Sequence, residues 1–228
     1  MTPKMNERLD LETDGAAHFP LALSNEEFAI LSRLGDDHRD TSAGSRLVGN
    51  DAVQALVAKG QSLHRIARAA LGTGARAVRA VLFDKTAANN WPLGWHQDRV
   101  IAVKERADVP GFAPFTLKQG ILHVQPPAEV IAAMVTLRAH LDPVDEDNAP
   151  LLIANGSHRL GLVPVQDVDA VVGRSAITAC LAEPGDIWAY RTLILHASDA
   201  ARHPRRRRVL QIDFAATALP APLDWLGV

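Results

Sequence analysis

The spacing of the apolar residues changes near residue 75. Before that point apolar residues recur at helical spacing, and Gly60 and Gly72 end two of the helical segments. After it, short runs of β-branched and aromatic residues alternate with turn sequences such as Asn155-Gly156. Helices followed by many strands indicate an α+β fold, mainly β. We expect a double-sheet jelly-roll core with the N-terminal helices packed on it.

The length of 228 residues suits one domain, and we expect a single domain over residues 1–228. It would comprise a helical portion over 1–75, the jelly-roll core over 76–216 and a C-terminal tail over 217–228. Ser24 and Glu27 form a capping-box sequence that predicts the start of the first helix. Strands are expected at 78–83, 100–103, 134–141, 151–154, 176–180, 187–196 and 209–214.

Composition excludes several classes of protein. Lys and Arg number 24 against 26 Asp and Glu, so nucleic acid is not expected as the main partner. No stretch approaches the roughly 18 apolar residues of a membrane span. Residues 1–8 resemble no signal peptide, and the single cysteine, Cys180, rules out an internal disulfide. We expect a cytoplasmic protein, and no heptad or symmetric patch indicates an oligomeric state.

The sequence His96-Gln97-Asp98 is the candidate for metal binding. On a strand, residues two apart project to the same side, so this histidine and carboxylate can reach one metal. A second such pair, His38 and Asp40, lies in a charged loop without a strand pattern. His196, at the end of a late apolar strand, is the expected third ligand. Two histidines and one carboxylate form the facial triad of Fe(II) oxygenases.

Two further segments carry polar residues where a strand is expected. Arg207 opens the strand at 209–214, where a buried guanidinium could pair bidentately with a carboxylate, although residues 205–208 could instead be a solvated basic run. In the strand at 134–141, Arg138 and His140 share one face and apolar residues share the other. That strand is either half exposed to water or faces a ligand inside the barrel. We propose Arg138 and His140 as substrate-binding residues.

Three motifs together resemble the phytanoyl-CoA dioxygenase family over about residues 80–216. They are Trp-His-Gln-Asp at 95–98, Asn-Gly-Ser-His-Arg at 155–159, and His196-x-Ser198 with an arginine eleven residues beyond His196. The resemblance implies a double-stranded β-helix and an Fe(II)- and 2-oxoglutarate-dependent oxygenase that consumes O2. It also implies that His96, Asp98 and His196 bind the iron.

The resemblance further implies that Arg207, helped by Ser198, binds the distal carboxylate of 2-oxoglutarate. Lys85 matches a lysine that often precedes the metal loop in the family. Arg206 is the rival for the arginine role, and Arg207 is preferred because it fits the family spacing. The sequence departs from the family at 148–150, where Asn-Ala-Pro stands in place of Asn-Gly and a small residue. That departure concerns substrate contacts more than the metal.

The reaction implied is hydroxylation of a small or medium organic metabolite, with succinate and CO2 as co-products. Asp98 fills a position where a related halogenase has a small residue that leaves room for chloride, which favours hydroxylation or desaturation. Two alternatives remain open at this point. One is a cupin-like metalloenzyme that does not use 2-oxoglutarate, and the other is a non-catalytic binding protein on the same fold.

Overall fold

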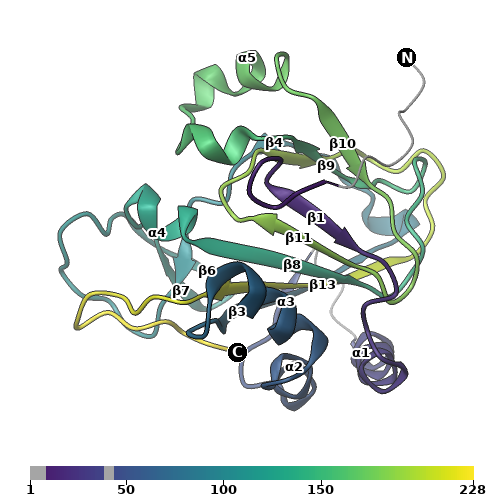
Figure 1. Ribbon diagram of the computed structural model, residues 1–228, viewed down its shortest axis with the longest axis horizontal. Helices are drawn as coiled ribbons and strands as arrows, with labels where there is room; N and C mark the ends of the chain where they lie inside the picture. Colours follow the sequence, from purple (N-terminus) through teal and green to yellow (C-terminus); the bar gives the residue numbers. More distant parts are fainter. Residues whose placement is uncertain (1–8, 39–43) are drawn as a thin grey trace.

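Antiparallel sheets dominate the computed structural model, which describes residues 9–38 and 44–228 (Figure 1). The large sheet has the strand order β1-β11-β8-β13-β3-β2 and the smaller one the order β10-β9-β12-β4. A third sheet, β5-β7-β6, lies at one end. The strands of the large sheet are β1 (Ala16–Phe19), β2 (Ser45–Arg46), β3 (Arg76–Lys85), β8 (Met134–His140), β11 (Ile187–Arg191) and β13 (Arg207–Ala215). This mainly β architecture confirms the predicted jelly-roll class.

The other elements complete the two remaining sheets and the helical layer. The smaller sheet contains β4 (Leu93–His96), β9 (Leu151–Ala154), β10 (Ile177–Cys180) and β12 (His196–Ser198). The third sheet contains β5 (Ile101–Ala102), β6 (Phe115–Lys118) and β7 (Ile121–Val124). The helices are α1 (Asn25–Asp37), α2 (Asp51–Val57), α3 (Ser62–Leu71), α4 (Ala128–Ala132) and α5 (Val168–Val172). In the described residues, no helix is long and apolar enough to cross a bilayer.

Helices α2 and α3 cover the outer face of the large sheet (Figure 1). Leu137 and Leu210, on adjacent strands of that sheet, belong to the same buried cluster as Val53 of α2 and Leu63 of α3. Each fully buried aliphatic side chain of this kind contributes roughly 1.5–3 kcal/mol. The outer face therefore supplies much of the hydrophobic stabilisation, and the inner face is free to carry polar residues.

Glu27 connects two helices at their N-termini. It forms the predicted capping box with Ser24 at the start of α1, since the Ser24 amide donates to Glu27 Oε2 at 2.7 Å. The same carboxylate also accepts the Ser62 amide at 2.6 Å and the Ser62 hydroxyl at 2.8 Å, at the start of α3. Burial would raise the pKa of Glu27, but these hydrogen bonds outweigh burial and lower it. One buried carboxylate therefore fixes α1 against α3.

The prediction of a single strand at 187–196 is wrong, because this segment forms two strands, β11 and β12, joined by a turn. The Ile194 amide donates to the Arg191 carbonyl at 2.9 Å, which closes a turn. This turn carries the chain from the large sheet into the smaller one, where His196 lies opposite His96 in register. The turn is itself buried, so the apolar pattern of the sequence continues through it and hides the break.

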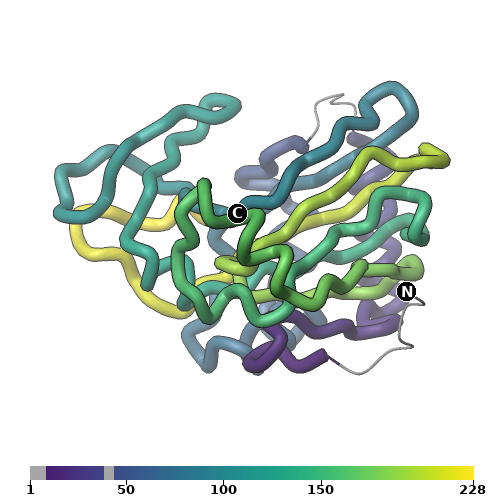
Figure 2. Tube along the Cα trace, turned by 90° about the horizontal axis from the view of Figure 1, so that it is seen from above, coloured from purple at the N-terminus to yellow at the C-terminus, as the bar shows by residue number. Residues whose placement is uncertain are grey.

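Several elements were missed by the sequence analysis. Strands β1 and β2 lie within the portion expected to be helical, and they form the two edges of the large sheet. The strands β6 and β7 were not predicted either. Figure 2 shows the C-terminal segment running to the same end of the molecule as this third sheet, where Trp225 forms a β-bridge with Val103. The division into 1–75, 76–216 and 217–228 remains a proposal about organisation.

We predict that Glu27→Ala lowers the free energy of unfolding by about 3 kcal/mol, because it leaves the two buried donors of Ser62 without an acceptor and removes the capping partner of the Ser24 amide. Glu26→Ala is the matched control, since Glu26 is the exposed neighbour in the same helical turn and should change stability by less than about 0.5 kcal/mol. Urea denaturation of both variants measures the difference. Equal effects of the two substitutions would contradict the proposed link between α1 and α3.

Candidate functional site

The inner face of the large sheet carries an unusual series of buried polar side chains. Alternate residues of β13 face inward, and each lies in register with inward residues of β3 and β8. Asp213 lies opposite Arg79 and Thr136, Gln211 opposite Arg138, and Arg207 opposite Lys85. All seven residues of β8 are buried, so the interpretation of this strand as half exposed is wrong. Its polar face looks into the barrel.

His96 and His196 lie side by side on neighbouring strands of the smaller sheet. Their ring centroids are 4.3 Å apart. In each ring Nδ1 donates to the backbone carbonyl two residues earlier, that of Gly94 at 2.8 Å and that of Ile194 at 3.0 Å. These hydrogen bonds fix the tautomer and leave both Nε2 lone pairs available, as in histidines that bind metals. Burial, together with His96, lowers the pKa of His196 to about 4, so its imidazole is neutral at pH 7.

Gln97 fixes the loop that follows β4. Its side chain is buried, donates to the Leu193 and Gly161 carbonyls and accepts the Val163 amide at 2.8 Å. Asp98, the next residue, is close enough to both histidines for their charges to influence its titration. Burial would raise the pKa of Asp98, but Arg79 and the two histidines outweigh burial and lower it. The carboxylate is therefore ionised at neutral pH.

Arg79 and Asp213 form a buried ion pair next to this carboxylate. Arg79 Nε donates to Asp213 Oδ2 at 2.5 Å, and its Nη2 lies 3.4 Å from Asp98 Oδ2. The Thr136 hydroxyl donates to Asp213 Oδ1 at 3.0 Å. This pair was not predicted from the sequence. The sequence signal for it is a positive charge, Arg79, on one strand and a negative charge, Asp213, on another, each between apolar neighbours. Two opposite charges that are both buried are expected to pair.

The donor set fits a divalent iron, although the side chains do not form a coordination shell as they stand. Among residues 9–38 and 44–228, no group of three His, Cys, Asp or Glu side chains is arranged to hold a metal ion. One oxygen of Asp98 is turned toward Arg79. Two imidazoles whose Nε2 atoms make no hydrogen bond within the described part of the chain and one ionised carboxylate are nevertheless the ligand types of a facial triad. The competing Asp40 lies outside the described residues.

Arg207 and Ser198 meet at the carbonyl of Ala149. Both side chains are buried and donate to this oxygen, the Ser198 hydroxyl at 3.1 Å. Ala149 belongs to the segment that departs from the family pattern, and its φ of 54° lies in the left-handed region that favours glycine. Arg206, the rival arginine, points outward and pairs with Asp84 at 2.8 Å. Of the two candidates, Arg207 is therefore the arginine that faces the interior.

Lys85, Arg138 and Arg207 form a buried cationic group. Burial and the charge of Arg207 lower the pKa of Lys85 to about 8, and burial and Arg138 lower the pKa of Arg207 to about 9. Lys85 Nζ donates to the Asp199 carbonyl at 3.0 Å, and Arg138 Nη1 donates to Gln211 Oε1 at 2.7 Å. Among the described residues, none of these three side chains forms a salt bridge with a carboxylate. Such a group is suited to a dianion.

Polar atoms without partners surround this cationic group. Arg138 Nε, Arg207 Nε and both ring nitrogens of His140 are buried and lack a hydrogen bond. Burial, with the charges of Arg138 and Arg207, lowers the pKa of His140 well below its usual value, so the ring is neutral. Unpaired buried donors and acceptors cost free energy. Their concentration here makes this part of the interior suited to binding a polar molecule.

Comparison with solved structures finds the same fold. EctD from S. alaskensis in its apo form superimposes with a TM-score of 0.70 at 17% identity, over 100% of this chain and 84% of that one. SnoN, the alpha-ketoglutarate-dependent epimerase from nogalamycin biosynthesis, gives 0.64 at 17% identity, over 91% and 80%. HygX from Streptomyces hygroscopicus with nickel, 2-oxoglutarate and hygromycin B bound gives 0.62 at 15% identity, over 91% and 85%.

Sequence comparison identifies the family. No curated protein sequence matches the chain significantly. The family model described as phytanoyl-CoA dioxygenase (PhyH) matches residues 11–209 and therefore covers most of the chain. This range includes the His96 and His196 strands, Asp98, Arg207 and the buried cationic group. The chain therefore belongs to the phytanoyl-CoA dioxygenase family of Fe(II)- and 2-oxoglutarate-dependent oxygenases.

Proposed function

We propose that this oxygenase hydroxylates a small or medium organic molecule and releases succinate and CO2. Iron would be held by His96, Asp98 and His196. The observation that carries the proposal is the pair of histidine rings, whose Nε2 atoms are available beside the ionised carboxylate of Asp98. When bound, Fe(II), 2-oxoglutarate and O2 supply the oxidising power. The protein residues supply position, charge and exclusion of water.

The residues divide this work between them. The carbonyls of Gly94 and Ile194 hold the two imidazoles in the metal-binding tautomer, and Arg79 holds the Asp98 carboxylate in its ionised form. Arg207 and Lys85 would bind the distal carboxylate of 2-oxoglutarate, with Ser198 as a hydrogen-bond donor. A guanidinium is suited to this role because it can bind a carboxylate bidentately.

Arg138 and His140 remain proposed contacts to a small molecule. Both face the interior next to Arg207, as their electrostatic influence on each other indicates. Their position next to Arg207 supports a contact with 2-oxoglutarate as well as the substrate contact expected from the sequence. Their unpaired ring and guanidinium nitrogens would gain partners in either complex.

Solved structures of the same fold support a small-molecule substrate. EctD was crystallised with 2-oxoglutarate and 5-hydroxyectoine, and HygX with hygromycin B. SnoN is an epimerase, so the same fold also supports an outcome other than hydroxylation. The carboxylate of Asp98 occupies the position that a chloride would need, which favours hydroxylation over halogenation. The cytoplasmic location expected from the sequence stays a prediction.

We predict that Fe(II) and 2-oxoglutarate, added anaerobically, give a saturable visible charge-transfer band. His96→Ala should abolish the band, because it removes one of two imidazole ligands. Arg207→Ala should weaken 2-oxoglutarate binding by about 10- to 100-fold through loss of a charge-assisted hydrogen bond.

The matched control is His203→Ala, since His203 lies in the exposed basic loop. This variant should retain the full band. A wild-type protein that binds iron but gives no band would support the cupin-like alternative that does not use 2-oxoglutarate. Folded protein that takes up neither component would support a non-catalytic binding protein.

The pH dependence of 2-oxoglutarate affinity tests the role of Lys85. The pKa of this amine is lowered to about 8, and a bound dianion would raise it again. The affinity should therefore be greatest below pH 8 and fall by up to about tenfold between pH 7 and pH 9. Anaerobic calorimetry measures this change.

Two variants separate Lys85 from other lysines. Lys85→Met should bind more weakly at pH 7 and lose the additional fall between pH 7 and pH 9. Lys59→Met, which changes an exposed lysine after α2, should behave as the wild type. An unchanged pH profile in Lys85→Met would remove Lys85 from the 2-oxoglutarate site.

A further inference from the structure

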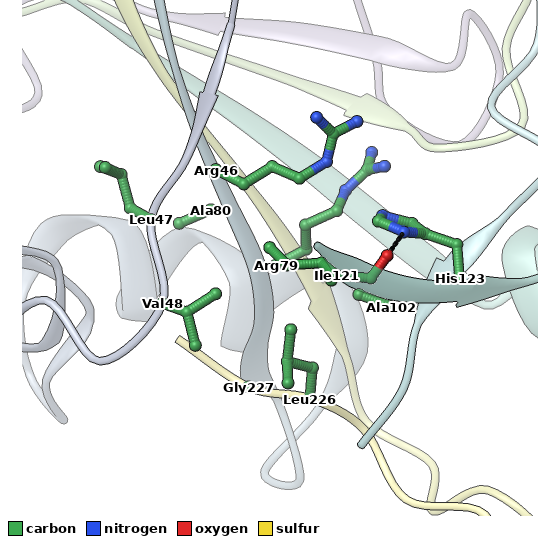
Figure 3. A pocket seen from close by; sticks show the side chains of 10 residues that line it. All are labelled: Arg46, Leu47, Val48, Arg79, Ala80, Ala102, Ile121, His123, Leu226 and Gly227. Atoms are coloured by element: carbon green, nitrogen blue, oxygen red, sulfur yellow. Dashed lines mark hydrogen bonds between the residues drawn. The ribbon is translucent and has the colours of Figure 1, made fainter. Parts of the chain in front are cut away.

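A second group of cationic side chains lies around Arg46 and Arg79. It surrounds a small pocket between β2, β3, β7 and the C-terminal segment (Figure 3). Arg46, Arg79 and His123 supply the polar part of its lining, and Leu47, Ala102 and Leu226 contribute to the apolar part. The 2-oxoglutarate role proposed above uses none of Arg46, Lys118 and His123.

Arg46 extends into this pocket beside Arg79. It lies on β2 opposite Val81 of β3, and Val81 is on the inner face of the sheet in alternation with Arg79. Figure 3 shows the two guanidinium groups side by side. Arg46 Nε is buried and has no hydrogen-bond partner. Burial and the charge of Arg79 lower the pKa of Arg46, and the opposite charge of Asp98 offsets them only in part.

Lys118 is an exposed residue whose positive charge lies close enough to Arg46 and Arg79 for their charges to influence its titration. It ends β6, and the adjacent turn is tied to β2 because the Arg46 amide donates to Gln119 Oε1 at 3.3 Å. Partial burial and the charges of Arg46 and Arg79 lower the pKa of Lys118. In the part of the chain that the structure describes, neither Arg46 nor Lys118 forms a salt bridge.

His123 supplies a hydrogen-bond acceptor at the same place. The residue is 0% exposed, and its Nδ1 donates to the Ile121 carbonyl at 2.9 Å. Burial lowers the pKa of His123 to about 4, so the ring is neutral and Nε2 carries a lone pair. This Nε2 has no partner. A bound molecule with an O–H or N–H group would satisfy it.

The charges near Asp98 do not balance without a further anion. Asp213 and Asp98 both face Arg79, and Asp98 is also the proposed iron ligand. Arg46 and Lys118 also lie within the electrostatic influence of Asp98, so three cations, Arg46, Arg79 and Lys118, share two carboxylates among the described residues. Two like charges in a partly desolvated pocket repel each other and attract an anionic ligand.

We propose that the substrate carries an anionic group, a carboxylate or a phosphate, that binds Arg46 and Lys118. This inference rests on the proposed function and specifies its substrate class. Arg79 contacts Asp98 and lies beside Arg46 (Figure 3), so the anionic group would be anchored near Asp98 by side chains other than Lys85, Arg138 and Arg207. A hydroxyl or amino group near the anion would donate to His123 Nε2.

The test uses the anaerobic protein saturated with Fe(II) and 2-oxoglutarate, so that the first cationic group is already occupied. Acetate, inorganic phosphate and the neutral analogue acetamide serve as probes, with chloride holding the ionic strength constant. Calorimetry measures the dissociation constant of each probe. We expect acetate or phosphate, but not acetamide, to bind, and the better anion identifies the kind of group.

Arg46→Gln and Lys118→Gln should each weaken binding of that anion by about tenfold or more. Arg68→Gln is the matched control, because it removes an exposed arginine of α3 far along the chain from the pocket, and it should bind the anion as the wild type does. Retention of the charge-transfer band in every variant shows that the proteins are folded and loaded.

The outcomes separate the two proposals. A normal band with no binding of either anion, equal binding of acetamide, or wild-type affinity in Arg46→Gln overturns the anionic substrate and leaves the proposed function intact. A wild-type protein that forms no band overturns the proposed function itself. Loss of anion binding in Arg46→Gln and Lys118→Gln, with the band retained, supports the anionic substrate.

Discussion

The ion pair between Arg79 and Asp213 is the constraint around which the interior is organised. Burying two charges is costly, and removal of one partner alone typically costs about 3–5 kcal/mol because the other is left uncompensated. The pair is satisfied only when β3, β13 and β8 hold one register, since Thr136 also donates to Asp213. Arg79 then reaches Asp98 and connects the large sheet to the loop that follows β4.

The two faces of the large sheet have divided roles. The outer face packs against the helices through aliphatic side chains such as Leu137 and Leu210, which supply hydrophobic stabilisation. The inner face can therefore carry arginines, a lysine and unpaired nitrogens that would be unfavourable in an ordinary core. Two cationic groups result, one around Arg207 and one around Arg46.

Local sequence patterns predicted the elements well where a period or a cap defines them. The capping box of Ser24 and Glu27 marked the start of α1, and alternation in β8 assigned Arg138 and His140 to one face. Alternation left open whether that face meets water or a second sheet, because a period of two is the same in both cases. The strand break between β11 and β12 escaped prediction because the turn has no glycine or proline and its second half, Leu193 and Ile194, is buried and apolar.

The sequence by itself determined which residues could form helices and strands, which side chains share a face, and that His96 and Asp98 lie two residues apart. Only the tertiary structure decided which of these faces meet. His196 reaches His96 through the crossing from one sheet to the other, and Arg46 reaches Arg79 because β2 pairs with β3 at the sheet edge. Local periodicity is a property of one element, whereas contacts between distant segments depend on strand order and register, which no short pattern encodes.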